Sequence, residues 1–274
     1  MSCSKFPPKF PLKLHHYIFR GTRPYLEGNL IQEFFVNRQL EQKKINNSLK
    51  TSQKDKIDFT QLSHIDPVAL SFQFEPTYTG GKREKFAQRS SKYRDLQTEG
   101  IQFCQTSRGG QITYHGPGQL VVYPIINLLD FQKLTSKCYV SMLERSVILA
   151  IGNSHLKGET TENTGVWCNG QKISSIGVNI RRSITSHGLS INNTTDLSYV
   201  NDEQLVMCGL PGTRQTSIST ELQKLNMSEV VPSIDHLAAD IVGQLAENLE
   251  IDSIITHIIE SPITSEEECL SLLN

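Results

Sequence analysis

Apolar residues recur at helical spacing in three segments of the chain, and each segment predicts a helix that faces a core. Residues 25–40 place apolar side chains three and four positions apart, which is the spacing of one helix face. Residues 135–151 repeat the pattern. Residues 234–249 do so again after Ser233, a residue type favoured at helix N-caps. These stripes are more typical of core than of a partner surface.

Other apolar segments have the pattern of strands. Residues 68–74 alternate along the chain, and residues 120–126 form a short, nearly continuous apolar run. Asn169 and Gly170 separate two strand-like runs and form the strongest short signal for a β-hairpin. Helices and strands mixed in this order, with no linker or internal repeat, predict a single α/β or α+β domain with a mixed sheet flanked by helices.

Two polar segments interrupt these elements. Residues 41–63 are rich in Lys, Asn, Gln and Ser, which indicates a solvated loop or an extension of the first helix. Residues 75–81 indicate a turn-rich loop, and the charged residues 82–100 indicate a surface insertion. The pair Gly81-Lys82 does not form a phosphate-binding loop, because no Ser or Thr follows the lysine and the first glycine of that motif is missing.

Composition narrows the class of protein. The chain has 274 residues, 37% hydrophobic and 20% charged, as in an ordinary globular protein large enough to bury a core. A net charge of −1 argues against a general nucleic-acid binder. No apolar run approaches the length of a membrane span. The six cysteines are scattered without Cys-x-x-Cys or zinc-type spacing, which favours a reducing compartment and no metal.

The N-terminus is basic and contains no acidic residue before Glu27. This composition is typical of a mitochondrial transit segment, although Pro7, Pro8 and Pro11 would break an amphipathic helix. We therefore expect residues 1–20 to be a basic leader. A mitochondrial transit segment is favoured over a disordered basic segment that has no targeting role.

Residues 108–124 contain four glycines and Pro117 around a group of polar side chains, and they run directly into the apolar residues 120–126. Glycine lets the backbone approach a ligand closely, so the pattern predicts a binding loop on a rigid sheet. An ordinary Gly-rich turn is the alternative.

Lys172 and Cys208 are the residues with reactive side chains in suggestive places. Alternation puts Lys172 on the inward face of its strand, either reaching out at the sheet edge or partly buried. A lysine in a desolvated site can act as a base. Cys208 lies in a short apolar run broken by Gly209, where a buried structural thiol is the default. A serine hydrolase is not supported, since no Gly-x-Ser-x-Gly motif occurs, and no protease-type signature surrounds Cys208.

The run Arg-Gly-Gly-x-x-Thr-Tyr-His-Gly-Pro-Gly-Gln-Leu at 108–120 resembles the signature of lipoyl(octanoyl) transferases. Three further segments resemble that family in the same order: Lys-Ile-x-x-Ile-Gly at 172–177, residues 185–196, and Cys208-Gly209. The resemblance covers residues 21 to 218 approximately. Two features differ, because Met207 stands where the family usually has proline and extra residues lie between Asp196 and Cys208.

The resemblance implies the biotin/lipoate protein ligase fold over residues 21–274. It also implies octanoyl transfer from octanoyl-acyl carrier protein to a lysine of lipoyl domains in the mitochondrial matrix. The acceptors would be 2-oxoacid dehydrogenase acyltransferase subunits and the glycine cleavage H protein, with no cofactor or metal. Cys208 would form the acyl-enzyme and Lys172 would act as the base. The expected substrate-binding residues are Arg108, Gly109, Gly110, Gln111, Ile112, Thr113, Tyr114, His115, Ser175, Ile176, Gly177, His187, Gly188, Leu189 and Ser190.

Two other functions remain open from the residues alone. An ATP-dependent lipoate or biotin-type protein ligase would share the fold and would need no catalytic cysteine. An inactive acyl-binding protein would keep the pocket without the chemistry, although the presence of both Lys172 and Cys208 argues against it.

Overall fold

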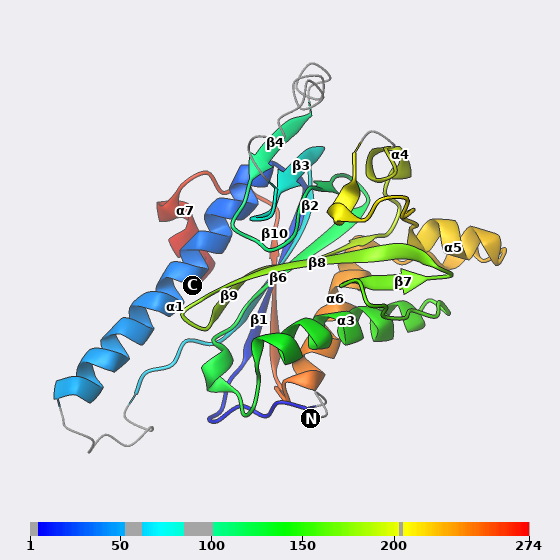
Figure 1. The fold of residues 1–274 in the computed structure, drawn as a ribbon. Helices are drawn as coiled ribbons and strands as arrows, with labels where there is room; N and C mark the ends of the chain where they lie inside the picture. Colours follow the sequence, from blue (N-terminus) through cyan, green and yellow to red (C-terminus); the bar gives the residue numbers. More distant parts are fainter. Residues whose placement is uncertain (1–4, 53–61, 85–100, 203–204, 274) are drawn as a thin grey trace.

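The computed structural model describes residues 5–52, 62–84, 101–202 and 205–273. A seven-stranded mixed sheet lies at its centre (Figure 1). From one edge to the other the strands are β10 (Ile254–Ile259), β1 (Leu14–Arg23), β2 (Val68–Phe74), β6 (Gln119–Ile125), β9 (Ile184–Asn192), β8 (Gln171–Arg181) and β7 (Val166–Cys168). Strands β10, β1 and β2 pair in parallel, and the remaining neighbours pair antiparallel.

Helices cover both faces of this sheet. The long helix α1 (Tyr25–Ser52) packs on one face, against β2, β6 and β9. Helices α3 (Ser136–Gly152) and α6 (Ile234–Asn248) pack together on the other face (Figure 1). Ser233 caps α6 by accepting a hydrogen bond from the His236 N–H, and Thr135 caps α3 in the same way. The three predicted helices and the mixed sheet between them are confirmed.

The polar residues after position 40 continue the first helix. Helix α1 reaches Ser52, so the first part of the segment 41–63 is the helix extension rather than a loop. Residues 53–61 of that segment and residues 85–100 of the predicted second insertion lie outside the described residues.

A second, three-stranded sheet lies where a turn-rich loop was expected. It consists of β4 (Gln102–Gln105), β3 (Thr77–Gly80) and β5 (Thr113–His115). The interpretation of residues 75–81 as a loop was wrong for residues 77–80, which form the buried strand β3, whereas Glu75 and Pro76 form a bend. Strand β3 pairs with β4 in parallel and with β5 antiparallel, and local turn signals do not reveal partners so distant in sequence.

Both ends of the chain contribute strands that the sequence did not indicate. Strand β1 begins at Leu14, so residues 14–20, which were assigned to the leader, form part of the central sheet. Strand β10 pairs with it and follows the predicted helix of residues 234–249, where the sequence indicated no strand. The prediction that the first residues target the chain to mitochondria stays a prediction.

The predicted hairpin is confirmed and places Lys172 next to its turn. Asn169 and Gly170 have φ values of 49° and 73°, as a two-residue type I′ turn requires. The remaining short elements are η3 (Leu128–Asp130), α4 (Leu197–Val200), η4 (Met207–Gly209), α5 (Ile218–Lys224), η5 (Ser228–Val230), α7 (Glu266–Leu270) and η6 (Ser271–Leu273). No helix within the described ranges is long and apolar enough to cross a membrane.

Candidate active site

A cavity of about 360 Å³ lies between the Gly-rich loop, strands β8 and β9, and the turn that carries Cys208. Thirteen of the fifteen predicted substrate-binding residues line it together with Cys208 and Lys172. They are Arg108, Gly109, Gly110, Gln111, Thr113, His115, Ser175, Ile176, Gly177, His187, Gly188, Leu189 and Ser190. Four segments that are far apart in the sequence therefore form one site.

Cys208 lies at the centre of the 3-10 turn η4 in a conformation unusual for an L-residue. Its φ of 56° and ψ of 12° lie in the left-handed region, which costs of the order of 1–3 kcal/mol for residues other than glycine. Its backbone N–H donates to the Ile112 carbonyl at 2.8 Å, which holds the turn against the Gly-rich loop. The Sγ atom lies 3.5 Å from the Ser175 hydroxyl and 3.9 Å from that of Thr113. The turn thus presents the thiol to two hydroxyl groups on the cavity wall.

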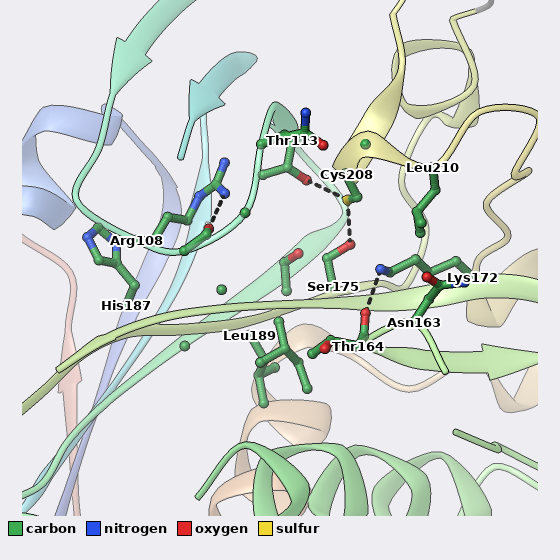
Figure 2. A pocket seen from close by; sticks show the side chains of 18 of the residues that line it. Arg108, Thr113, Asn163, Thr164, Lys172, Ser175, His187, Leu189, Cys208 and Leu210 are labelled. Atoms are coloured by element: carbon green, nitrogen blue, oxygen red, sulfur yellow. Dashed lines mark hydrogen bonds between the residues drawn. The ribbon is translucent and has the colours of Figure 1, made fainter. Parts of the chain in front are cut away.

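Lys172 is buried on β8, with only 3% of its surface exposed. Its ammonium donates to the Thr164 carbonyl at 2.8 Å and lies 5.6 Å from the centre of the Trp167 ring. Figure 2 shows this nitrogen pointing toward Ser175 and Cys208 across the same cavity. Of the two positions expected for Lys172, the structure shows the buried one and not the exposed one at the sheet edge.

Arg108 anchors the Gly-rich loop from inside the protein. Its guanidinium donates to the backbone and side-chain oxygens of Thr79 at 2.6 and 2.8 Å and to the Gly109 carbonyl at 3.0 Å. Burial lowers the pKa of this group from its ordinary value. In Figure 2, Arg108 and His187 lie on the side of Cys208 away from Lys172. The loop is therefore pinned at the end of the cavity opposite the buried lysine.

The two histidines of the cavity are neutral near neutral pH. Burial lowers the pKa of His115 to about 4, with a smaller effect of the nearby Arg108 charge in the same direction. The pKa of His187 falls to about 3 for the same two reasons. His115 Nδ1 lies 2.8 Å from Gln119 Oε1, and His187 Nε2 lies 3.3 Å from the Ser107 hydroxyl. These rings give the cavity polar walls without adding positive charge.

Ile112 and Tyr114 do not line the cavity. Both are buried in a small cluster with Met207, and Tyr114 stacks on Tyr199 at 4.9 Å between ring centres. Their contribution to the site is indirect, because this cluster supports the turn of Cys208 from behind. Met207 belongs to that cluster. It stands at the position where the family that this sequence resembles usually has proline.

Several lining residues were not predicted: Arg83, Val121, Tyr123, Glu162, Asn163, Thr164, Gly209 and Leu210. Val121 and Tyr123 lie two residues apart on β6, so the strand period places both on the same face of that strand. Residues 162–164 carry no comparable signal. They reach the cavity because their loop lies beside Lys172 in the fold, and Gly165 N donates to Glu144 Oε1 at 3.0 Å.

The arrangement is suited to acyl chemistry on a thiol. A nucleophile, two hydroxyl groups and a buried amine share one cavity, whose apolar walls include Val121, Ile176 and Leu189. The described residues contain no group of three or more His, Cys, Asp or Glu side chains that could hold a metal ion.

Comparisons with known proteins agree on one family. Residues 52–237 match the family model described as the lipoyl protein ligase A/B catalytic domain. The mitochondrial octanoyltransferase of Saccharomyces cerevisiae is 34% identical over 279 residues, which cover 88% of this chain and 83% of the yeast protein. A mitochondrial octanoyl-[acyl-carrier-protein]:protein N-octanoyltransferase of Danio rerio is 43% identical over 173 residues, covering 63% of this chain and 75% of that protein.

Solved structures show the same fold at low sequence identity. A putative lipoate protein ligase from T. acidophilum superposes with a TM-score of 0.62 at 14% identity and covers 96% of this chain and 93% of its own. A lipoate-protein ligase A bound with ATP superposes with a TM-score of 0.60 at 14% identity, with 96% and 94% covered. The expected lipoate ligase fold is therefore confirmed.

Proposed function

Because the chain belongs to the octanoyltransferases of the lipoyl protein ligase A/B family, we propose that it moves octanoyl from acyl carrier protein to lipoyl-domain lysines through a Cys208 thioester. The observation that carries this proposal is the placement of Cys208. Its thiol projects from a left-handed turn into a cavity that it shares with two hydroxyl groups and the buried Lys172.

The first half-reaction exchanges one thioester for another. Lys172 takes the proton of the Cys208 thiol, and the resulting thiolate attacks the carbonyl carbon of the octanoyl thioester. The tetrahedral intermediate collapses as the carrier thiolate leaves and takes the proton back from Lys172. The products are octanoyl-Cys208, a free carrier thiol and a neutral Lys172. No ATP is consumed, since the donor thioester is already activated.

We propose that two hydroxyl groups stabilise the oxyanion of this step. Ser175 and Thr113 lie 3.5 and 3.9 Å from Sγ, on the cavity wall beside the sulfur that would bond the tetrahedral carbon. Donors fixed in advance at such a position typically contribute about 10²–10³-fold each to turnover.

In the second half-reaction, the acceptor lysine attacks octanoyl-Cys208 as a free amine. Neutral Lys172 removes the surplus proton from the attacking nitrogen, and the Cys208 thiolate leaves. The new amide carries the octanoyl group, and the Lys172 ammonium again faces the thiolate. Each half-reaction therefore returns Lys172 and Cys208 to the state that the other requires.

In this proposal the octanoyl chain packs against the apolar walls of the cavity, which include Val121, Ile176 and Leu189. Burying about six methylene groups at roughly 0.8 kcal/mol each contributes at most about 5 kcal/mol to binding. Lys172 and residues 162–164 line the same cavity as Cys208, so we propose that the acceptor lysine reaches octanoyl-Cys208 past them.

The proposed location is the mitochondrial matrix. The relatives from S. cerevisiae and D. rerio are named as mitochondrial proteins, and the N-terminus of this chain is basic and acid-free up to Glu27. The acceptors there are the lipoyl domains of 2-oxoacid dehydrogenases and the glycine cleavage H protein.

A reconstituted transfer assay tests the proposal. Purified protein, octanoyl-acyl carrier protein and a lipoyl domain are mixed without ATP, and the mass of the domain is measured. Wild type should add one octanoyl group, whereas Cys208→Ser and Lys172→Ala should be strongly impaired while keeping a wild-type unfolding temperature. Transfer that requires free octanoate and ATP would instead support a ligase.

A further inference from the structure

The segment that follows Cys208 forms both backbone hydrogen bonds of Lys172. The Lys172 N–H donates to the Arg214 carbonyl at 3.0 Å, and the Thr216 N–H donates to the Lys172 carbonyl at 2.9 Å. Gln215 between them forms a parallel bridge with Lys172. The backbone that leads away from Cys208 thus lies directly beside the backbone of the buried lysine.

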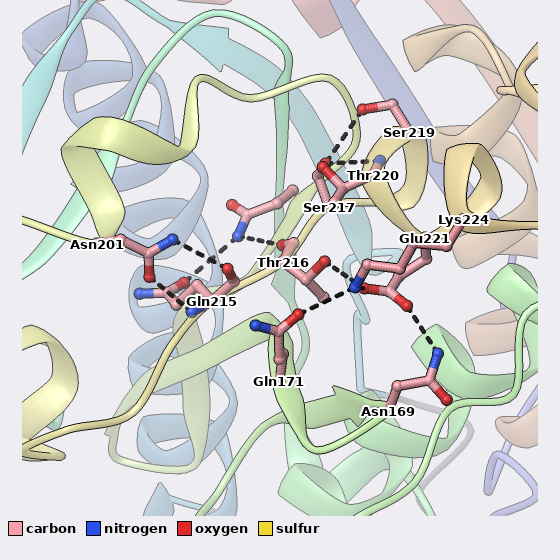
Figure 3. A network of polar contacts seen from close by, with 11 residues as sticks. Asn169, Gln171, Asn201, Gln215, Thr216, Ser217, Ser219, Thr220, Glu221 and Lys224 are labelled. Atoms are coloured by element: carbon pink, nitrogen blue, oxygen red, sulfur yellow. Dashed lines mark hydrogen bonds and ion pairs between the residues drawn. The ribbon is translucent and has the colours of Figure 1, made fainter.

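Asn201 and Gln215 close the base of the loop that carries Cys208. The Asn201 amide donates to the Gln215 carbonyl at 3.0 Å, and the Gln215 N–H donates to Asn201 Oδ1 at 2.7 Å (Figure 3). The Asn192 amide donates to the Thr216 carbonyl at 3.0 Å from the neighbouring strand β9. The two arms of the loop are therefore fixed to each other and to the central sheet.

A single buried carboxylate connects this segment to the Lys172 hairpin. Glu221 on α5 accepts hydrogen bonds from the Thr216 hydroxyl at 2.5 Å, from the Asn169 amide at 2.7 Å and from the Lys224 ammonium at 2.5 Å (Figure 3). Asn169 is in the hairpin turn, three residues before Lys172. Burial opposes the ionisation of Glu221, but these hydrogen bonds outweigh it and hold its pKa below the usual value.

A buried carboxylate is costly unless every partner is in place, so such a group fixes geometry more than it adds stability. The partners of Glu221 come from the Cys208 segment, from the hairpin turn and from its own helix. Their positions are therefore coupled through one side chain that does not itself line the cavity.

We propose that Glu221 is a positioning residue of this enzyme, which sets the placement of Lys172 relative to Cys208 through its bonds to Thr216 and Asn169. The inference rests on the proposed function, since it assigns Glu221 a role in that reaction. An error of about 1 Å in such a placement costs about 10²-fold in rate even when its source lies outside the chemistry.

Thr216→Val tests the link most cleanly, because it removes the hydroxyl and keeps the shape and the backbone. Thr216→Ser restores the hydroxyl, and Glu221→Gln removes the charge. Asn248→Ala is the matched control, since Asn248 is a buried amide on α6 that bonds Ser146 and Gln244, away from the cavity. For each variant we would measure kcat and KM for octanoyl transfer, the unfolding temperature, and the rate at which iodoacetamide alkylates Cys208, identified by peptide mass.

Thr216→Val and Glu221→Gln should lower kcat about 10- to 100-fold with little change in KM. They should also slow alkylation of Cys208, because Lys172, the proposed acceptor of the thiol proton, would no longer be held in place. Thr216→Ser should remain within about threefold of wild type, and Asn248→Ala should lose stability only.

Equal kcat in Thr216→Val and Asn248→Ala, in an enzyme whose wild type transfers octanoyl, would overturn the positioning role and leave the proposed function intact. If wild type transfers no octanoyl at all, the proposed function fails. The alkylation rates then decide alone: slower alkylation in Thr216→Val than in wild type supports the placement, and equal rates overturn it.

Discussion

Replacing Gly165 with alanine would place a side chain in space that Lys172 occupies. Gly165 has a φ of +130°, and a Cβ added there would lie 2.5 Å from the Ser174 carbonyl oxygen and 2.7 Å from Cε of Lys172. The Ser174 oxygen belongs to the backbone of β8 and cannot move alone. The contact with Cε can be relieved only by displacing the flexible lysine side chain, and its ammonium, which would lie 3.0 Å from the new carbon, would be displaced with it.

The size of the effect follows from these contacts. Backbone strain for a non-glycine residue in such a region costs of the order of 1–3 kcal/mol, which corresponds to a fall of roughly 2–12 °C in Tm for a chain of this size. A displacement of the ammonium by about 1 Å should lower turnover by about 10²-fold. We therefore expect Gly165→Ala to fold, to melt several degrees lower and to lose most of its octanoyl transfer.

Gly170→Ala separates the loss of stability from the loss of the lysine position. Gly170 lies in the turn of the same hairpin with a φ of +73°, but a Cβ there would meet nothing within 4 Å. It should lose about 1–2 kcal/mol of stability through backbone strain alone and keep its activity. Both variants would be compared by thermal melting and by lipoyl-domain octanoylation. If Gly165→Ala turned over as fast as Gly170→Ala, the argument that the position of Lys172 limits the reaction would be refuted.

Two further predictions concern the oxyanion and the buried histidines. Ser175→Ala should lower kcat by about 10²-fold while leaving KM nearly unchanged, since its hydroxyl is proposed to act on the developing oxyanion; a KM effect alone, measured under steady-state conditions, would argue for a binding role. Burial, as the largest cause, lowers the pKa of His16 and His115 to about 4 and that of His187 to about 3. Since the unfolded chain binds these protons first, stability is complete above about pH 6.5 and falls below it, by up to about 4 kcal/mol per pH unit for the three together. Urea unfolding at about pH 7 and about pH 5 would check this, and equal midpoints would contradict it.

Local sequence patterns predicted the elements that carry a clear pattern of their own, including β2 and β6, whose partners lie far along the chain. The hairpin at Asn169 and Gly170 and the three amphipathic helices are defined by their own residues, and all four are present. The strands β3, β1 and β10 were missed, and their pairing with distant segments is what identifies them as strands. The sequence of residues 77–80 has the composition of a loop. In the fold these four residues are buried and form β3 between β4 and β5.

The residues of the candidate site were also predicted only where they belong to a recognisable sequence pattern. Motif resemblance indicated Cys208, Lys172 and the Gly-rich loop, and the fold brings them to one cavity. The sequence did not reveal that Ile112 holds the backbone of Cys208 instead of lining the cavity. Residues 162–164 and Glu221 could not be predicted from the sequence either, because their roles depend on which segments lie side by side in the fold. A hydrogen bond between residues 52 positions apart, such as that of Asn169 with Glu221, has no periodic signature.

The most direct test of the account is the intact mass of the purified protein after mixing with octanoyl-acyl carrier protein in the absence of ATP. Wild type should gain one octanoyl group that hydroxylamine removes, as expected for a thioester, and Cys208→Ala should gain none. An adduct of equal size and lability in Cys208→Ala, or none in wild type while a lipoyl domain still becomes octanoylated, would contradict a Cys208 acyl-enzyme.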